Sequence, residues 1–154
     1  MHTTEQEHAI HVIGIELRTT NDKAMQTIPG HWQRFTNEGV ADKVPGRQSQ
    51  DVYAVYTNFE NAGRSNKGLY SLVLGVPVQA STPVPDGMLR VVLPAARRAV
   101  FPVEAGRFDL VGAKWQEIWS RDDLAKTFIA EAERYRADGQ IDILVGIEKE
   151  APRA

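Results

Sequence analysis

The chain has 154 residues, 42% hydrophobic and 25% charged, which is typical of a single globular domain. It contains no cysteine, which excludes disulfides, cysteine metal ligands and a cysteine nucleophile. A formal net charge of −2 argues against a basic surface, so we expect no direct binding of nucleic acid. Because the first residues, MHTTEQEHA, are polar and no long apolar run follows, we expect no signal peptide, no membrane contact and a cytoplasmic location.

The first half of the chain contains one helix-like segment among three strand-like ones. Its apolar residues recur at a spacing that places them on one helical face, and they are Ile28, Trp32 and Phe35. We expect Asn21 to cap this helix, Pro29 to open its regular part after an irregular turn, and Gly39 to end it. The strand-like segments are residues 10–18, 51–59 and 69–78.

A Pro- and Gly-rich break at residues 81–87 precedes a second half with the same order of elements. We expect Asp109 to cap the helix of this half, whose apolar face consists of Val111, Trp115 and Ile118. The strand-like segments are residues 88–103, interrupted by Pro94, and then 128–136 and 141–149.

The two predicted helices share the spacing of their apolar residues, with a tryptophan in the middle of each face. We interpret the chain as a duplicated strand–helix–strand–strand unit, residues 9–78 and 88–149, within one domain that spans residues 1–154. The predicted fold is α+β, in which the halves join into one antiparallel sheet and the two main helices cover one face. The alternative is coincidence, because any amphipathic helix has apolar residues at this spacing.

Five segments, in their order and spacing, carry a resemblance to the GyrI-like small-molecule-binding domain. They are IPGHWQRF (28–35), VYAVYTNFE (52–60), LYSLVLGVPV (69–78) with PDGM (85–88), KWQEIW (114–119), and AERYR (132–136) with IDILVGIEK (141–149). The same domain is the effector-binding part of multidrug-responsive transcription activators such as Rob and BmrR. The short stretch before the first strand leaves no room for a DNA-binding region, so the resemblance implies a stand-alone member.

The resemblance also implies a central pocket between two pseudo-symmetric halves, where family members bind bulky, often cationic, aromatic molecules. The family's pocket carboxylate falls within AERYR and corresponds to Glu133, whereas Leu144 stands where many relatives place a tyrosine. The aromatic residues expected to bind ligand beside Glu133 are Trp32, Tyr56, Tyr70, Phe101 and Trp115. Phe108 and Trp119 are further candidates for the walls, and the alternative for any one of these rings is packing in the core.

Strand alternation within residues 128–136 places Glu131, Glu133 and Tyr135 on one face and Phe128 on the other. If the helices cover the Phe128 face, Glu133 lies on the open or groove side of the sheet. The alternative for Glu133 is a solvated carboxylate at an edge, because glutamate is rarely fully buried. A carboxylate among aromatic rings suits a bulky organic cation, since neither attraction demands a strict hydrogen-bond geometry.

The sequence therefore favours a ligand-binding protein over an enzyme. We expect a receptor for an amphipathic, cationic small molecule, with a separate transcription factor as a further partner and with no cofactor or metal. One alternative is a hydrolase of strained, cyclopropane-type toxins, in which Glu133 is the acid/base and Tyr56 or Tyr70 assists. A second alternative, drawn from the family's namesake, is a protein inhibitor of DNA gyrase.

Overall fold

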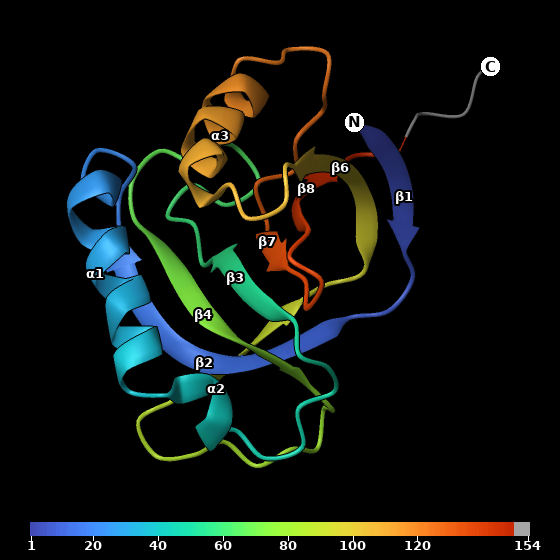
Figure 1. Ribbon diagram of the computed structural model, residues 1–154. Helices are drawn as coiled ribbons and strands as arrows, with labels where there is room; N and C mark the ends of the chain where they lie inside the picture. Colours follow the sequence, from blue (N-terminus) through green and yellow to red (C-terminus); the bar gives the residue numbers. More distant parts are fainter. Residues whose placement is uncertain (150–154) are drawn as a thin grey trace.

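The structure, a computed structural model, describes residues 1–149, and residues 150–154 of the predicted domain lie outside it (Figure 1). Its strands are β1 (His2–Gln6), β2 (Ile10–Thr19), β3 (Val52–Thr57), β4 (Tyr70–Val78), β5 (Leu89–Leu93), β6 (Ala96–Val103), β7 (Glu131–Tyr135) and β8 (Ile141–Ile147). Its helices are α1 (Ala24–Asn37), α2 (Val40–Lys43) and α3 (Val111–Trp119), with a 3-10 turn, η1 (Phe108–Leu110), before α3. Within residues 1–149, no helix combines the length and apolar character that a membrane crossing requires.

All eight strands of the described chain form one antiparallel sheet, in the order β1-β6-β8-β7-β3-β4-β2-β5. The predicted α+β class with an antiparallel sheet is therefore confirmed. The order is symmetric about the β7–β3 pair, so that β7, β8 and β6 on one side correspond to β3, β4 and β2 on the other. This is the order that a duplicated unit predicts, and the duplication remains our interpretation of it.

The outermost strands of the sheet are exchanged between the halves. β1 precedes β2 in sequence but pairs with β6, and β5 precedes β6 but pairs with β2. The sequence did not predict β1, because its residues, HTTEQ, include no apolar side chain that would indicate a buried face. Residues 88–103 form the two strands β5 and β6, separated at Pro94 as the sequence indicated.

Both main helices cover the same face of the sheet. Phe35 of α1 packs in a cluster that includes Ala54 of β3, and Trp115 of α3 packs in a cluster that includes Ile143 of β8. Ala54 and Ile143 flank Glu133 as its register partners on the neighbouring strands, so all three side chains point to one face. The expectation that the helices lie on one face is confirmed.

The start of α1 differs from the sequence prediction. The helix begins at Ala24, so Pro29 lies inside it rather than at its opening. Because proline has no N–H, the helical hydrogen bond from residue 29 to the Met25 carbonyl is missing. Asn21 is not the N-cap; Lys23 occupies that position, and the Asn21 amide donates to the Asn66 carbonyl at 3.4 Å. The side chain of Asn21 is thus used to join two loops.

The other predicted helix ends are partly confirmed. Gly39 has a φ of 59°, the left-handed conformation that ends a helix, and its N–H donates to the Thr36 carbonyl. Asp109 does not cap α3, because it lies in η1, where it pairs with Arg107 at 2.9 Å, and Leu110 takes the N-cap position.

Two facing glycines allow the longest strands to approach closely. Gly14 of β2 and Gly75 of β4 are register partners. A Cβ atom on Gly14 would collide with the backbone of Leu74, and one on Gly75 would collide with the carbonyl of Ile13. Because the colliding atoms belong to the backbone of paired strands, they cannot shift without disturbing the sheet. Both positions therefore require glycine.

We predict that Gly75→Ala destabilises the fold by about 3 kcal/mol or more, because it forces an overpacked contact in the sheet. Gly30→Ala is the matched control: Gly30 is an exposed residue of α1, and nothing lies within 4 Å of an added Cβ. We expect this control to stabilise the helix by up to about 1 kcal/mol. Denaturant unfolding followed by circular dichroism measures both, and equal changes would contradict the close approach.

Candidate ligand-binding site

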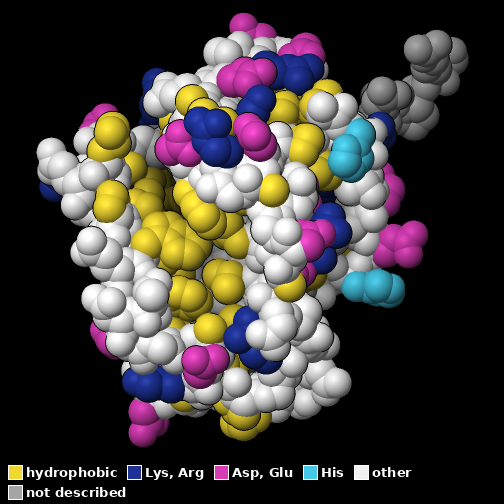
Figure 2. Space-filling view, in the orientation of Figure 1, with side chains coloured by type: hydrophobic (Ala, Val, Ile, Leu, Met, Phe, Trp, Pro, Cys, Tyr) yellow, Lys and Arg dark blue, Asp and Glu magenta, His cyan; other side chains and the backbone are white. Residues whose placement is uncertain are grey.

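A cavity of about 990 Å³ opens between α1, α3 and the sheet. Figure 2 shows it as a hollow in which hydrophobic side chains gather. Its volume is at the upper end of the range for sites that hold drug-sized molecules. Both halves of the chain contribute to its walls. Its aromatic lining consists of Trp32, Tyr56, Phe59, Tyr70, Phe108, Trp115, Trp119 and Tyr135.

Three side chains of the central strand β7 line the cavity. Glu131, Glu133 and Tyr135 share one face of β7, as the alternation predicted, and all three line the cavity. The helices, however, cover this face and not the opposite one, where Ala132 packs in a separate apolar cluster. Phe128 lies before the start of β7 and so does not define a face of the strand. Glu133 is therefore beneath the helices and not on an open side of the sheet.

Glu133 is buried, with 2% of its surface exposed, so it is not a solvated edge carboxylate. One oxygen accepts hydrogen bonds from the Tyr56 hydroxyl at 2.6 Å and from the Trp115 indole N–H at 2.7 Å. The other accepts from the Tyr135 hydroxyl at 2.5 Å. Burial raises the pKa of Glu133, and the three donors oppose that rise by stabilising the ionised form.

The rings around Glu133 pack against one another in edge-to-face, tilted and stacked contacts. Tyr56 has its ring centroid 5.7 Å from that of Tyr70 and 5.5 Å from that of Trp115. Tyr135 lies 5.0 Å from Trp32 and stacks on Phe108 at 5.7 Å. The residues Trp32, Tyr56, Tyr70 and Trp115, expected from the sequence to bind ligand, thus all line the cavity. Tyr135 was the residue that the same alternation could have added to that set.

Phe101 does not line the cavity, contrary to the expectation from sequence. It is 3% exposed and packs in the core between the sheet and α3, with the Arg121 guanidinium 5.6 Å from its ring centroid. Its strand, β6, lies two places from the central pair, and Phe101 packs there in one cluster with Trp115 and Ile118 of α3. Phe108 and Trp119, which the sequence left as further candidates, do line the cavity.

A second carboxylate, Glu131, lines the cavity with only 4% of its surface exposed. Within residues 1–149 its carboxylate accepts no hydrogen bond from a protein donor, unlike that of Glu133. Burial raises the pKa of Glu131 to about 7, a rise that the more distant charges of Arg98 and Lys126 oppose. Sequence reasoning placed Glu131 on the correct face but gave no sign that it would be buried without a partner.

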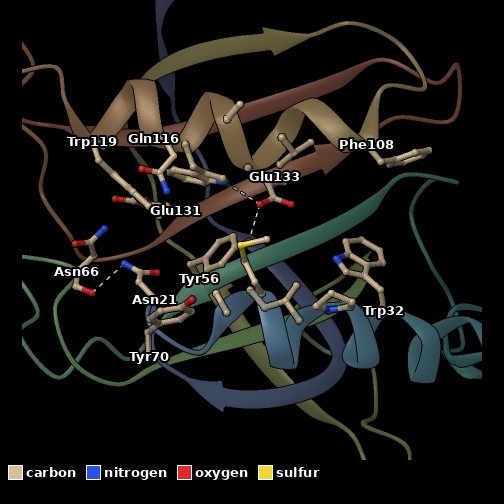
Figure 3. Close-up of a pocket in the computed structure, with 18 of the residues that line it drawn as sticks. Asn21, Trp32, Tyr56, Asn66, Tyr70, Phe108, Gln116, Trp119, Glu131 and Glu133 are labelled. Atoms are coloured by element: carbon tan, nitrogen blue, oxygen red, sulfur yellow. Dashed lines mark hydrogen bonds between the residues drawn. The ribbon is translucent and has the colours of Figure 1, made fainter.

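Three side-chain amides lie toward the same end of the cavity as Glu131. Figure 3 shows Gln116 beside Glu131, with Asn21 and Asn66 nearby, whereas Trp32 and Phe108 lie toward the opposite end. We call the end at Glu131 and the three amides the polar end, although Tyr70 and Trp119 also lie toward it (Figure 3). Glu133 lies between this end and the end at Trp32 and Phe108 (Figure 3).

Residues 3–147 match the family described as integron-associated effector binding protein, Cass2. Among solved structures, an integron cassette protein from the mobile metagenome of Vibrio cholerae aligns with 18% identity and a TM-score of 0.75, over 96% of this chain and 95% of that one. A Staphylococcus aureus MU50 protein, named for bacterial transcription regulation, aligns with 17% identity and a TM-score of 0.74, over 96% and 97%. The structure of SAV2435 bound to tetraphenylphosphonium aligns with 16% identity and a TM-score of 0.77, over 96% and 93%. No curated protein sequence matches the chain.

We predict that Glu131→Gln stabilises the fold above neutral pH. Because the folded pKa of about 7 exceeds the ordinary value of 4.5, the folded state holds a proton that the unfolded state releases between these pH values. Stability of the unmodified protein therefore falls as pH rises through this window. Glutamine has no proton to lose, so the variant avoids the free-energy cost of ionising Glu131 in the folded state. It should be more stable than the unmodified protein by about 3 kcal/mol above pH 7 and by less than about 1 kcal/mol near pH 5.

Denaturant titrations at about pH 5 and about pH 8 measure the two differences. Glu117→Gln is the matched control, because Glu117 is exposed on α3 and pairs with Lys114 at 2.8 Å. We expect no gain from it at either pH. If Glu131→Gln raised the free energy of unfolding equally at both pH values, the gain would not come from the ionisation of Glu131.

Proposed function

The chain belongs to the family of integron-associated effector-binding proteins, and on that premise we propose that it binds a bulky organic cation in the cavity between α1 and α3. The observation that carries the proposal is the sign of the charges at the site. Within the described residues, every charged side chain that lines the cavity is acidic: Asp109, Glu131 and Glu133. The remaining walls are mostly aromatic and aliphatic, which suits a lipophilic body with positive charge.

The environment of Glu133 favours a cation that needs no hydrogen bond. Both of its oxygens are already engaged by Tyr56, Trp115 and Tyr135, so it supplies negative charge without requiring a donor from the ligand. The aromatic faces add an attraction of about 0.5–2 kcal/mol for each cation contact. A delocalised or quaternary cation is also cheaper to remove from water than a compact one.

Two comparisons support this class of ligand. SAV2435, which shares the fold, binds tetraphenylphosphonium, a lipophilic cation without hydrogen-bond donors. The matched family is named for effector binding, and a further neighbour is named for transcription regulation. We therefore extend the proposal to a receptor whose ligand signals to a separate transcription regulator.

A hydrolase of strained, cyclopropane-type electrophiles is the second candidate. The direct hydrogen bond between Glu133 and Tyr56 favours it, because it joins a carboxylate of raised pKa to a proton donor in a largely apolar cavity. We rank the receptor first because both Glu133 oxygens accept bonds from the protein, which leaves little capacity to activate water. Within residues 1–149, we found no feature that favours the gyrase-inhibitor alternative.

We predict that Glu133→Gln weakens binding of methyltriphenylphosphonium by about 5- to 150-fold, equivalent to about 1–3 kcal/mol. Triphenylphosphine oxide has the same three rings but no net charge, so its binding should change much less. All three tryptophans of the chain line the cavity, so quenching of intrinsic fluorescence measures both affinities.

Glu117→Gln removes the same charge from the exposed side of α3 and should leave both affinities unchanged. Equal losses for the cation and the oxide in Glu133→Gln would show that Glu133 acts only as a structural residue. Mass analysis of the recovered compounds separates a receptor, which returns them unchanged, from a hydrolase.

A further inference from the structure

The two glutamates on the cavity face of β7 differ in what surrounds their oxygens. Glu133 accepts three hydrogen bonds, whereas Glu131 accepts none from any donor in residues 1–149, although both are at least 96% buried. A largely buried carboxylate without protein donors is costly, because it loses most of its solvation. Such a group, directed into a cavity, is available to a donor that the ligand brings.

The nearby cations of the protein do not supply that donor. Arg98 donates its three nitrogens to the Gln6 side chain and to the carbonyls of Ala130 and Pro94. Lys126 donates to the Arg121 carbonyl at 2.6 Å. Neither cation forms an ion pair with Glu131 in the described part of the chain. Their charges act on Glu131 only from a distance, and the space in front of its oxygens is the cavity.

The groups at the polar end of the cavity match the needs of an ammonium ion. A protonated amine presents one to three N–H donors, and a carboxylate together with amide carbonyls accepts them. Glu131, Gln116 and Asn21 line this end, and the Asn21 amide nitrogen already bonds Asn66, which leaves its oxygen free to face a ligand (Figure 3). The opposite end, at Trp32 and Phe108, suits an apolar body.

We propose that the polar end of the cavity is a subsite for a protonated amine, with Glu131 as its acceptor, so that the preferred ligands are aromatic amphiphilic amines. The inference rests on the proposed function and narrows its ligand class. In this arrangement Glu133 attracts the positive charge at long range, and Glu131 receives the N–H hydrogen bond. A quaternary cation can use the first interaction but not the second.

Proton release on binding is a second consequence of the same geometry. Near pH 6 Glu131 is mostly protonated, and an ammonium ion beside it favours the ionised form. The other ionisable side chains that line the cavity are Tyr56 of β3, Tyr70 of β4, Glu133 and Tyr135 of β7, and Asp109 of η1. The charges of Arg98 of β6 and of Lys126 also act on Glu131, although neither residue lines the cavity. The tyrosines have pKa values raised further above their ordinary range and stay neutral at this pH.

The test compares 3,3-diphenylpropylamine, which is protonated at neutral pH, with its N,N,N-trimethyl derivative, which has the same rings and charge but no N–H. We expect Glu131→Gln to weaken binding of the amine by about 10- to 100-fold. The trimethyl derivative should change by less than about 3-fold. Glu133→Gln should weaken both probes by the same factor, and Glu117→Gln should weaken neither.

Calorimetry at about pH 6 in two buffers of different ionisation enthalpy gives the protons released per amine bound. We expect close to one for the unmodified protein and close to zero for Glu131→Gln. Circular dichroism confirms that each variant is folded at this pH, where the neutral amide resembles the protonated acid.

The outcomes separate this inference from the proposed function. If neither probe binds the unmodified protein, the proposed function itself is overturned. If both probes bind but Glu131→Gln weakens them equally, or proton release is the same in both proteins, the cation-binding function stands and the amine subsite is overturned.

Discussion

The antiparallel pairing of β3 with β7 is the contact on which the cavity depends. It joins the two halves of the sheet and places Ala54 opposite Glu133 and Tyr56 opposite Glu131. Because Ala54 is small, the space beside Glu133 remains open to hydroxyl and indole donors from neighbouring elements. A shift of one residue in this register would turn both carboxylates to the opposite face, away from the helices.

The periodic parts of the fold could be predicted from the sequence. Long apolar strands and one-sided helices leave a clear pattern, and strand alternation correctly placed Glu133 and Tyr135 on one face. The resemblance then placed a cavity between the halves. The pattern could not predict which side of the sheet the helices cover. Strand β3 has apolar residues on both faces, and on β7 the face that holds the two glutamates is the one beneath the helices.

The features that the sequence prediction missed or placed wrongly depend on residues that are distant in the sequence. β1 is polar along its whole length and exists because the edge of β6 offers it hydrogen bonds. Phe101 is aromatic and well placed by alternation, but whether it faces a cavity or a helix depends on how α3 lies over β6. The contrast between Glu131 and Glu133 has the same origin, because the donors of Glu133 come from three separate elements.

The exchange of outer strands also bears on how the molecule assembles. β1 covers the edge of β6, and β5 covers the edge of β2, so each half by itself would expose the edge that the other half covers. On the interpretation that the chain is a duplicated unit, a single unit could cover that edge by exchanging first strands with a second copy, in a domain-swapped dimer whose stability depends on concentration. On the same interpretation, joining the two units in one chain makes the association intramolecular, so the cavity between them does not depend on protein concentration.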